Sequence, residues 1–452
     1  MKQLLLIFAV VALVGCGEAA KEKAAKIKAA ADARAAAEKK ATETATIPQP
    51  PQTTSDKLIA DPILEKAIRG ELKKRTGELT KANLDKVTRL YLGINLTDIP
   101  IELEKLTQLS SLYLHVNKLT SVKGLENLTQ LETLHLGANH LTDVKELEKL
   151  DQLTTLKLEG NQLTDVKGLE NLTQLKELNL HENKLTSVKG LEKLTQLKKL
   201  SLGNNQLTDV KGLENLTQLE ELYIEKNKLT DVKALEKFTE LETLYLGGNQ
   251  LTYVPKELEN LTQLKELNLY NNQLTSVKGL EKLTKLEKLK LSSNKLTDVK
   301  ELENLTQLTQ LNLTSNKLID VKSLEKLTQL QWLSLSNNPD LTKAQIDELQ
   351  KALPKCRIFH DFPLNPEEQA KVFEGAIRFA AKKPKGELTK ADLEKVTSIE
   401  LGQIDMTSVK GLEKLTKLKL LSLHGNPDLT KAQIDQLKKA LPRCYIESNP
   451  TK

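Results

Sequence analysis

Leucines recur with a fixed spacing over residues 90–335 of this chain. In the segment "LKELNLHENKL", Leu175, Leu178 and Leu180 are followed by Asn183. The other copies of the pattern end in the same way, at Asn95, Asn117, Asn139, Asn161, Asn205, Asn227, Asn249, Asn272, Asn294, Asn316 and Asn338. Neighbouring asparagines are 22 residues apart, except for one interval of 23. A fixed period in this range predicts a solenoid.

Each repeat predicts one short strand and one turn. In Leu-x-Leu the two leucines point to one side and the residue between them to the other, because side chains alternate along a strand. One repeat cannot bury these leucines alone, so successive coils must stack and their strands must pair in parallel. The asparagine amide has enough donors and acceptors to satisfy backbone groups that stacking hides from water. The second half, as in "LTSVKGLEKLTQL", is too short for a full helix and predicts 3₁₀ helix.

The pattern "LxxLxLxxNxLTDVKGLExLTQL" resembles the 22-residue leucine-rich repeat of bacterial internalin-type proteins. This resemblance implies an α/β solenoid, in which a curved array has a parallel β-sheet on its concave face, short 3₁₀ turns on its convex face, and helical caps. It also implies a protein that recognises other macromolecules. Two repeats carry Ile99-Pro100 and Val254-Pro255 in place of Val-Lys. Both resemble a proline-containing variant of the repeat and are expected to change the coil locally without breaking it.

Composition narrows the possible functions. The net charge of the 452 residues is +6, with Lys and Glu interspersed along the turns, which does not favour nucleic acid as a partner. Three cysteines are too few for a disulfide framework. No Gly-x-Ser-x-Gly, phosphate loop, His-Glu-x-x-His or Cys-x-x-Cys motif occurs. We therefore expect a protein that is not an enzyme and that has no cofactor.

The N-terminus predicts export and a lipid anchor. Residues 1–15 combine a basic start with an apolar run over residues 4–14, which is typical of a signal peptide and too short for a membrane span. The "LVGC" that ends at Cys16 is similar to the lipobox of bacterial lipoproteins, which implies that Cys16 carries a lipid. An ordinary cleavage site is the alternative. Gly17 occupies the place where inner-membrane retention usually calls for Asp, so the same analogy favours the outer membrane.

Residues 16–60 are predicted to be a lipidated cysteine followed by a stalk. The first part is rich in Ala, Lys and Glu and favours helix, although it has almost no large apolar residue to bury. The second part, "IPQPPQTTSDK", favours an extended chain. We interpret both as a solvated spacer. A membrane or peptidoglycan contact through the lysines is the alternative, which the interspersed acidic residues disfavour.

Residues 61–360 are predicted to form a leucine-rich repeat domain of 12 repeats with a cap at each end. Asp61-Pro62 predicts a helix start, and the helix is expected to end near Gly77. Its apolar face is predicted to consist of Ile63, Ala67, Ile68 and Leu72. The closing helix is predicted from Thr342 and Gln345, which have the spacing of a capping box. Its apolar face is predicted to consist of Ile346, Leu349 and Leu353.

Residues 361–452 are predicted to be a duplicated short module with 2 repeats between two caps. "GELTKADLEKVTSIEL" repeats the earlier "GELTKANLDKVTRLYL", and "NPDLTKAQIDQLKKALPRCYI" repeats the first closing segment. Two repeats are below the usual minimum for stable stacking, so the module should depend on the first array or on its own caps. Cys356 and Cys444 occupy matching places in the two closing segments. Two small buried thiols are expected there, with a disulfide between them as the alternative.

The variable positions around each Leu-x-Leu strand are expected to lie on the concave face, as in other leucine-rich repeats. The candidate partner-binding residues are the aromatic residues and histidines among them, Tyr91, Tyr113, His115, His135, His181, Tyr223, Tyr245, Tyr270 and Trp332. The remaining positions on this face are predicted to be Lys157, Asn179, Ser201, Glu225, Asn268, Lys290, Asn312. Amphipathic rings suit recognition surfaces, although tyrosine also suits an exposed strand through its β-propensity. His115 and His135 lack a third ligand, so no metal site is predicted.

These expectations combine into one hypothesis about function. The protein is expected to be a non-enzymatic, membrane-anchored lipoprotein of the cell envelope that binds a protein or glycan partner through the concave face of its solenoid. The alternative is a structural envelope lipoprotein that acts as a spacer or scaffold without a dedicated ligand.

Overall fold

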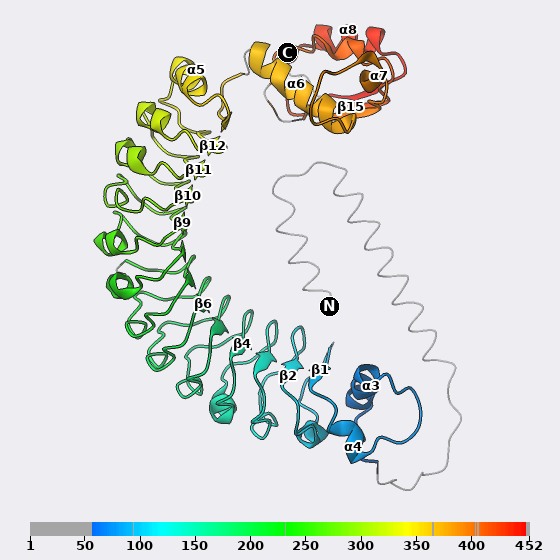
Figure 1. Cartoon of the computed structure of the whole chain (residues 1–452), viewed down its shortest axis with the longest axis vertical. Coiled ribbons are helices and arrows are strands. Elements are labelled where there is room, and N and C mark those ends of the chain that lie inside the picture. Colours follow the sequence, from blue (N-terminus) through cyan, green and yellow to red (C-terminus); the bar gives the residue numbers. More distant parts are fainter. Residues whose placement is uncertain are drawn as a thin grey trace. The chain divides into compact units, whose positions relative to one another are not determined.

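The computed structural model describes residues 57–448, except positions 94, 231, 364–365, 403 and 405. The predicted signal peptide, Cys16 and nearly all of the predicted stalk lie outside the described residues. The repeats form one parallel sheet whose strands follow each other in chain order (Figure 1). Its thirteen strands are β1 (Arg89–Tyr91), β2 (Ser111–Tyr113), β3 (Thr133–His135), β4 (Thr155–Lys157), β5 (Glu177–Asn179), β6 (Lys199–Ser201), β7 (Glu221–Tyr223), β8 (Thr243–Tyr245), β9 (Glu266–Asn268), β10 (Lys288–Lys290), β11 (Gln310–Asn312), β12 (Trp332–Ser334) and β13 (Arg357–Phe359).

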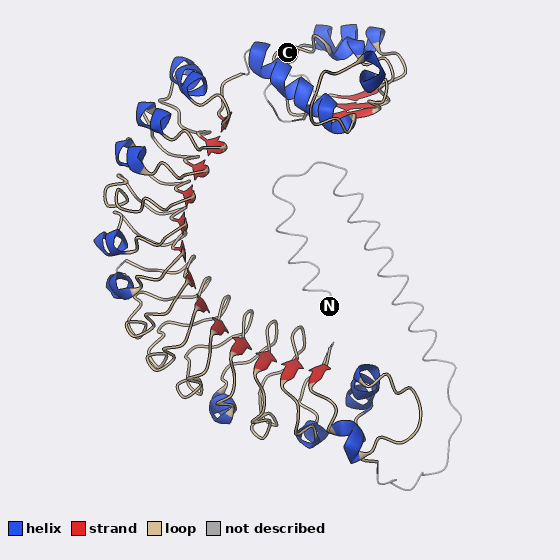
Figure 2. Ribbon diagram, in the orientation of Figure 1, coloured by secondary structure: helices blue, strands red, loops and turns tan. Residues whose placement is uncertain are grey.

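The register of the sheet places leucine opposite leucine. Leu178 of β5 pairs with Leu200 of β6, and Leu222 of β7 pairs with Leu244 of β8. All four side chains are fully buried. The predicted curved solenoid with its sheet on the concave face is confirmed, and Figure 2 shows the strands along the inner side of the array.

The repeated asparagines form a ladder inside the array. The Asn205 amide donates to the carbonyl of Leu180 in the preceding coil at 3.0 Å and to Leu202 in its own coil at 2.9 Å. Its carbonyl accepts from the amide of Leu185 at 3.0 Å. Each asparagine therefore satisfies backbone groups in two neighbouring coils, as the sequence predicted. Asn95 of the first coil is the exception, because it is exposed and has a φ of 77°.

The outer side of the array carries 3₁₀ helices in about half of the coils. They are η1 (Ile101–Lys105), η2 (Lys145–Lys149), η3 (Lys233–Lys237), η4 (Lys256–Asn260), η5 (Lys300–Asn304) and η6 (Lys322–Lys326). Coils with glycine at the second position of this segment form successive turns instead, for example at Gly168 and Gly212, whose φ angles are 95° and 100°. Glycine adopts this left-handed conformation readily. A residue in this conformation cannot be part of a right-handed 3₁₀ helix.

The two proline-containing coils keep their place in the sheet. Pro100 directly precedes η1, and Pro255 directly precedes η4. The longer interval of 23 residues is absorbed outside the strands, because Leu244 of β8 still pairs with Leu267 of β9. The expected local change without a break in the coil is confirmed.

The N-terminal cap consists of α3 (Pro62–Glu71) and α4 (Lys81–Leu84). The Asp61 carboxylate accepts from the Leu64 amide at 2.7 Å, as the helix-start signal predicted. The predicted apolar face was partly wrong. Ile63 is 42% exposed, whereas Leu64 is fully buried beside Ile68. The helix also ends at Glu71 instead of near Gly77, because Lys73 turns into the left-handed region with a φ of 52°.

The C-terminal cap of the array is α5 (Lys343–Ala352). Thr342 and Gln345 form the predicted capping box, and Ile346 and Leu349 are buried. The chain then adds β13 to the sheet, with Ile358 opposite Leu333. This strand was not predicted, because "CRIFH" lacks the Leu-x-Leu pattern that marks the others.

Residues 366–447 form a second, three-stranded parallel sheet with its own helices. The strands are β14 (Ser398–Glu400), β15 (Leu420–Ser422) and β16 (Tyr445–Glu447), and the helices are α6 (Pro366–Ala380), α7 (Lys390–Leu393), α8 (Lys431–Ala440) and the 3₁₀ helix η7 (Leu412–Lys414). Its core extends from Phe373 in α6 to Ile434 and Leu437 in α8. The module therefore packs against caps of its own.

The two matching cysteines are both free thiols. Cys356 is buried, and burial raises the pKa of its thiol to about 11. Cys444 is half-buried against the second core, and burial also raises its pKa. Raised pKa values disfavour the reactive thiolate, so both cysteines fit the predicted structural role.

Candidate partner-binding surface

The concave face of the array is built from three columns of side chains. In β7 and the two residues that follow it, Glu221, Tyr223 and Glu225 alternate with the buried Leu222 and Ile224. The sheet register repeats this arrangement in every coil. We call these positions the first, third and fifth columns. Every candidate residue predicted from the sequence falls in one of them, with Trp332 in the first column.

An N-terminal aromatic group lies on β1 to β3. The rings of Tyr91 and Tyr113 are stacked, with centroids 4.2 Å apart and planes 11° apart. His135 meets Tyr113 edge to face at 4.7 Å, and its centroid is 6.5 Å from that of His115. Burial lowers the pKa of His135, and the nearby Lys157 lowers it further. His135 is therefore a neutral ring at neutral pH.

A central aromatic group lies on β7 to β9. The rings of Tyr223 and Tyr245 meet edge to face with centroids 4.9 Å apart. The Tyr223 hydroxyl donates to Glu221 at 2.8 Å, and the Tyr245 hydroxyl donates to Glu266 at 2.5 Å. Burial, followed by these hydrogen bonds, raises the pKa of both phenols well above the usual value. Both phenols therefore remain protonated donors.

A third pair lies at the C-terminal end of the sheet. Trp332 of β12 and Phe359 of β13 have ring centroids 5.5 Å apart. The Arg357 guanidinium lies 4.6 Å from the centroid of the Phe359 ring. Phe359 was not predicted as a concave residue because its strand was not predicted. The segment "RIFHD" carries no clear signal for this strand, because Ile358 and Phe359 are adjacent apolar residues and do not alternate with polar ones.

The predicted aromatic row is thus three separate groups. Third-column polar residues separate them, namely Lys157, Asn179 and Ser201 after the N-terminal group and Asn268, Lys290 and Asn312 after the central group. His181 lies in the fifth column between the first two groups, where its Nδ1 is 3.7 Å from Glu225. The concave face therefore offers three aromatic patches instead of one continuous stripe.

Glycines in the fifth column form recesses that larger side chains of the next coil fill. Glu159 leans over Gly137, Glu225 leans over Gly203, and Tyr270 leans over Gly247. A Cβ placed on Gly247 would lie 2.0 Å from Cδ1 of Tyr270. This arrangement was not predicted from the sequence. The signal was present as the alternation of glycine with larger residues in the fifth column of successive repeats.

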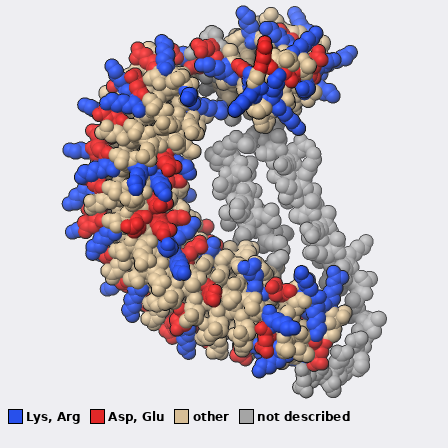
Figure 3. All heavy atoms as spheres, viewed as in Figure 1, with Lys and Arg blue, Asp and Glu red and all other residues tan. Residues whose placement is uncertain are grey.

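Charges on the concave face are mostly paired between coils. Lys157 pairs with Glu177 at 3.3 Å, and Lys199 pairs with Glu221 at 2.9 Å. On the outer side, Lys and Arg alternate with Asp and Glu without a large area of one sign (Figure 3). This interleaving agrees with the interspersed Lys and Glu of the turns, and the face seen in Figure 3 shows no extended basic stripe of the kind that favours nucleic acid.

The second sheet brings Ser422, His424 and Glu400 together. The Ser422 hydroxyl lies 2.8 Å from Nδ1 of His424, and the same nitrogen lies 3.8 Å from Glu400. A catalytic triad uses one ring nitrogen for the nucleophile and the other for the carboxylate. Here one nitrogen faces both groups, and Ser422 is 3% exposed. This cluster is therefore a hydrogen-bonded structural contact.

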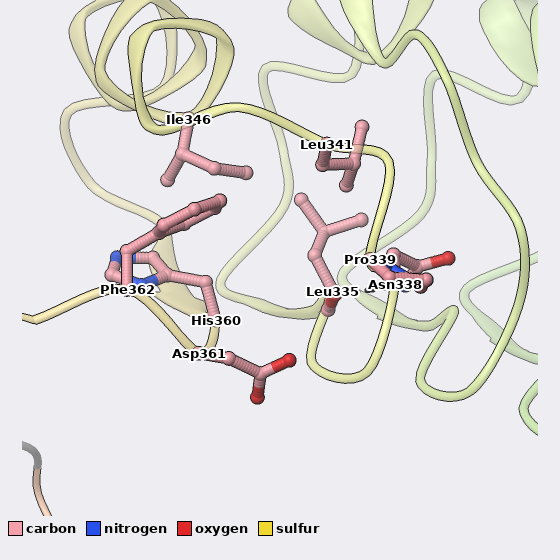
Figure 4. A pocket seen from close by; sticks show the side chains of 8 residues that line it. All are labelled: Leu335, Asn338, Pro339, Leu341, Ile346, His360, Asp361 and Phe362. Carbon is pink, nitrogen blue, oxygen red and sulfur yellow. Dashed lines mark hydrogen bonds between the residues drawn. The ribbon is translucent and has the colours of Figure 1, made fainter.

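A small cavity lies next to the C-terminal cap of the array (Figure 4). Its volume is about 110 Å³, and it is lined by Leu335, Asn338, Pro339, Leu341, Ile346, His360, Asp361 and Phe362. The His360 side chain is 5% exposed, and burial lowers its pKa although Glu368 lies 3.9 Å from Nε2. The Asp361 carboxyl group points away from the apolar residues in Figure 4. The cavity is too small for a drug-sized ligand.

The described part of the chain offers neither a metal site nor a membrane-spanning helix. Residues 57–448, apart from the gaps given above, contain no group of three or more His, Cys, Asp or Glu residues placed to hold a metal ion. In the same residues, none of the helices has the length and apolar character that crossing a bilayer requires.

Comparison with known proteins defines the structural class of this protein. The chain matches the family model of leucine-rich repeats, in blocks of two copies, over residues 107–149, 129–172, 151–193, 173–215, 195–237, 239–282 and 284–327. The fold and these matches define a leucine-rich repeat solenoid, a fold commonly used in protein–protein recognition. No enzymatic family is indicated. No match was found among curated protein sequences.

The solved structures place this solenoid beside bacterial internalin-type proteins. An internalin, InlF of Listeria monocytogenes, is similar with a TM-score of 0.59 and 25% identity, over 87% of this chain and 96% of that one. A leucine-rich repeat protein of Leptospira interrogans gives 0.59 and 28%, over 81% and 97%. The functional domain of InlJ from Listeria monocytogenes gives 0.57 and 22%, over 81% and 80%, and shares the fold alone.

Proposed function

We propose that this protein is a lipid-anchored component of the bacterial cell envelope that binds a protein or glycan partner through its concave face. The observation that carries the proposal is the grouping of aromatic side chains on that face. Tyr91 is 52% exposed, and the rings of Tyr113, Tyr223, Tyr245 and Trp332 are partly exposed. Aromatic rings supply contact area at low entropic cost, so they are favoured at recognition surfaces.

The arrangement of the tyrosines supports recognition over a spacer role. Tyr223 and Tyr245 do not contribute to the leucine core, because they point away from the buried Leu222 and Leu244. A spacer requires only the leucines and asparagines. Hydrogen bonds to Glu221 and Glu266 instead hold the two phenols in a fixed arrangement. A pre-organised aromatic pair reduces the entropic cost of binding.

The binding proposal is tested with the double variant Tyr223→Ala/Tyr245→Ala. Partners are first captured from the envelope by crosslinking to the full chain and identified, and their affinity is then measured. We expect the double variant to lose most of this affinity while the melting temperature changes little. Tyr253→Ala is the matched control, because Tyr253 is 65% exposed and lies outside the strands. Equal affinity of the double variant and the control would contradict the proposal.

The anchoring proposal rests on the lipobox-like "LVGC" that ends at Cys16. Cells that express the chain are labelled with a fatty acid, and the Cys16→Ser variant serves as the control. We expect label in the chain and none in the variant. Protease treatment of intact cells then locates the solenoid. Cleavage indicates that the concave face is outside the cell, and protection indicates a periplasmic partner. Equal labelling of chain and variant would refute the lipid anchor.

A further inference from the structure

The central aromatic group contains one carboxylate without a basic partner. Glu221 and Glu266 in the first column are paired with lysines of neighbouring coils at 2.9 and 3.2 Å. Among the described residues, Glu225 in the fifth column forms no ion pair with lysine or arginine. His181 lies at ion-pair distance from it, 3.7 Å away, and is cationic only when protonated. Glu225 is therefore the one of these three carboxylates without a lysine or arginine at ion-pair distance among the described residues.

The carboxylate of Glu225 is also largely removed from solvent. Its side chain is 17% exposed and lies in the recess above Gly203. Its Oε2 is buried and has no hydrogen-bond partner among the described residues. A carboxylate oxygen in this state is costly, because it has lost water without gaining a donor. Oε2 itself is closed to a partner, but a positive charge bound at the exposed part of the Glu225 side chain would offset this cost electrostatically.

The side chains around Glu225 suit a planar organic cation. Tyr223 precedes it by two residues on the same face, and Tyr245 occupies the next coil. Lys199 and Lys290 already lie 5.5 and 5.7 Å from the centroids of these two rings. The rings thus stand where they attract cations. A metal ion is disfavoured, because no group of three ligand residues occurs in the described chain.

We propose that Glu225, Tyr223 and Tyr245 form a site for one arginine side chain of a polypeptide partner. The guanidinium stacks on a tyrosine ring and donates hydrogen bonds to the Glu225 carboxylate, for which its flat, forked shape is suited. This inference rests on the proposed function and adds the chemistry of the partner. It predicts a partner segment with an exposed arginine instead of a neutral glycan.

Glu159 provides an internal comparison. It leans over Gly137 in the same way and also has a buried Oε2 without a partner. Its third-column neighbour, however, is Lys157 instead of a tyrosine. Without a tyrosine ring beside the carboxylate, this recess is unsuited to arginine. Glu159→Gln is therefore a control that changes the same charge, in the same column, in the same kind of recess.

The test uses the full chain with ¹³C-labelled tyrosine and short peptides as probes. The peptide Ac-Gly-Ser-Arg-Ser-Gly-NH₂ is titrated against the same peptide with citrulline, the neutral isostere of arginine. We expect about tenfold weaker binding of the citrulline peptide, which corresponds to the loss of one charged contact. Glu225→Gln should weaken binding of the arginine peptide by about the same factor, and Glu159→Gln by less than about twofold.

The outcomes separate this inference from the proposed function. Equal binding of both peptides, no binding of the arginine peptide, or equal effects of the two glutamate variants would overturn the arginine site. Concave-face recognition would still stand if Tyr223→Ala/Tyr245→Ala abolished binding of the captured partner. If that double variant kept its partner, the proposed function would fail as well. Melting temperatures of both glutamate variants verify that the fold is intact.

Discussion

Asn83 and Asp392 occupy the same place in two copies of one cap, and each accepts a hydrogen bond from the corresponding lysine. Lys74 donates to the Asn83 carbonyl oxygen at 2.9 Å, and Lys383 donates to the Asp392 carboxylate at 2.6 Å. In both caps the amide of the N-cap threonine donates to the same side chain, at 3.2 and 3.1 Å. The two side chains therefore form the same hydrogen bonds, although Asn83 is neutral and Asp392 is charged.

This difference predicts that the second module is the more acid-sensitive one. Lys383, followed by Thr389, holds the pKa of Asp392 well below its usual value. Because the folded-state pKa is depressed, the stability that Asp392 contributes is present above its unfolded pKa of about 4 and is lost as the pH falls toward the folded value.

We expect Asp392→Asn to flatten this acid dependence. Hydrogen exchange of the α7 amides, measured between pH 3 and pH 7, would detect the change. The reciprocal Asn83→Asp should introduce acid dependence at α4. Identical pH profiles of wild type and Asp392→Asn would contradict this account.

The recess under Tyr270 predicts a substitution that acts on the ring alone. Gly247 is not in the left-handed region, so its backbone tolerates alanine. The new methyl group would collide with the Tyr270 ring, which must leave the recess. We expect a change in the Tyr270 NMR signals and a stability loss of about 1 kcal/mol. Gly93→Ala is the control, because nothing lies within 4 Å of the added atom. An unmoved Tyr270 ring would show that the recess is not filled as described.

The asparagine ladder predicts a large cost for one small deletion. Asn205→Ala would leave the carbonyls of Leu180 and Leu202 and the amide of Leu185 buried without their partner. We expect a loss of about 3 kcal/mol in the free energy of unfolding. Urea denaturation measures it, with the exposed Asn215→Ala as the control. A loss as small as that of the control would mean that water replaces the ladder.

Backbone strain predicts a stabilising substitution. Val116 has a φ of 60°, a conformation that is unfavourable for a β-branched residue, and its side chain is 55% exposed. Asparagine tolerates this conformation better, so Val116→Asn should raise stability by about 1 kcal/mol. Ile319→Asn is the control, because Ile319 is 60% exposed and has no positive φ. Thermal unfolding compares the two, and equal melting temperatures would argue against strain at Val116.

The sequence predicted the fold well because the repeat specifies the backbone many times over. Leu178 and Asn183 belong to a pattern with eleven further copies, so an error at one copy is corrected by the others. The ends have no such redundancy. Leu64 was missed in favour of Ile63 because a single helix of ten residues tolerates more than one apolar face.

The candidate surface was predicted only in part. The positions on the concave face follow from alternation along the strands, so Tyr223 and Tyr245 were placed correctly. Their grouping was not predictable, because it depends on rotamers such as those that direct each hydroxyl to a glutamate. Glu159 and Glu225 were not recognised as a pair for the same reason, since their recesses are created by glycines in other coils.

The residues that hold the coils together differ from those that form the concave face. This difference affects how such a chain can diversify. Buried apolar residues, the asparagines and the backbone pairing of the sheet hold the coils together, whereas three outward positions per coil determine the concave face. Copying a coil therefore copies the architecture without fixing the recognition chemistry. A duplicated coil can acquire new outward residues while its parent retains the old ones. New specificities can accumulate along the length of the array at little risk to folding.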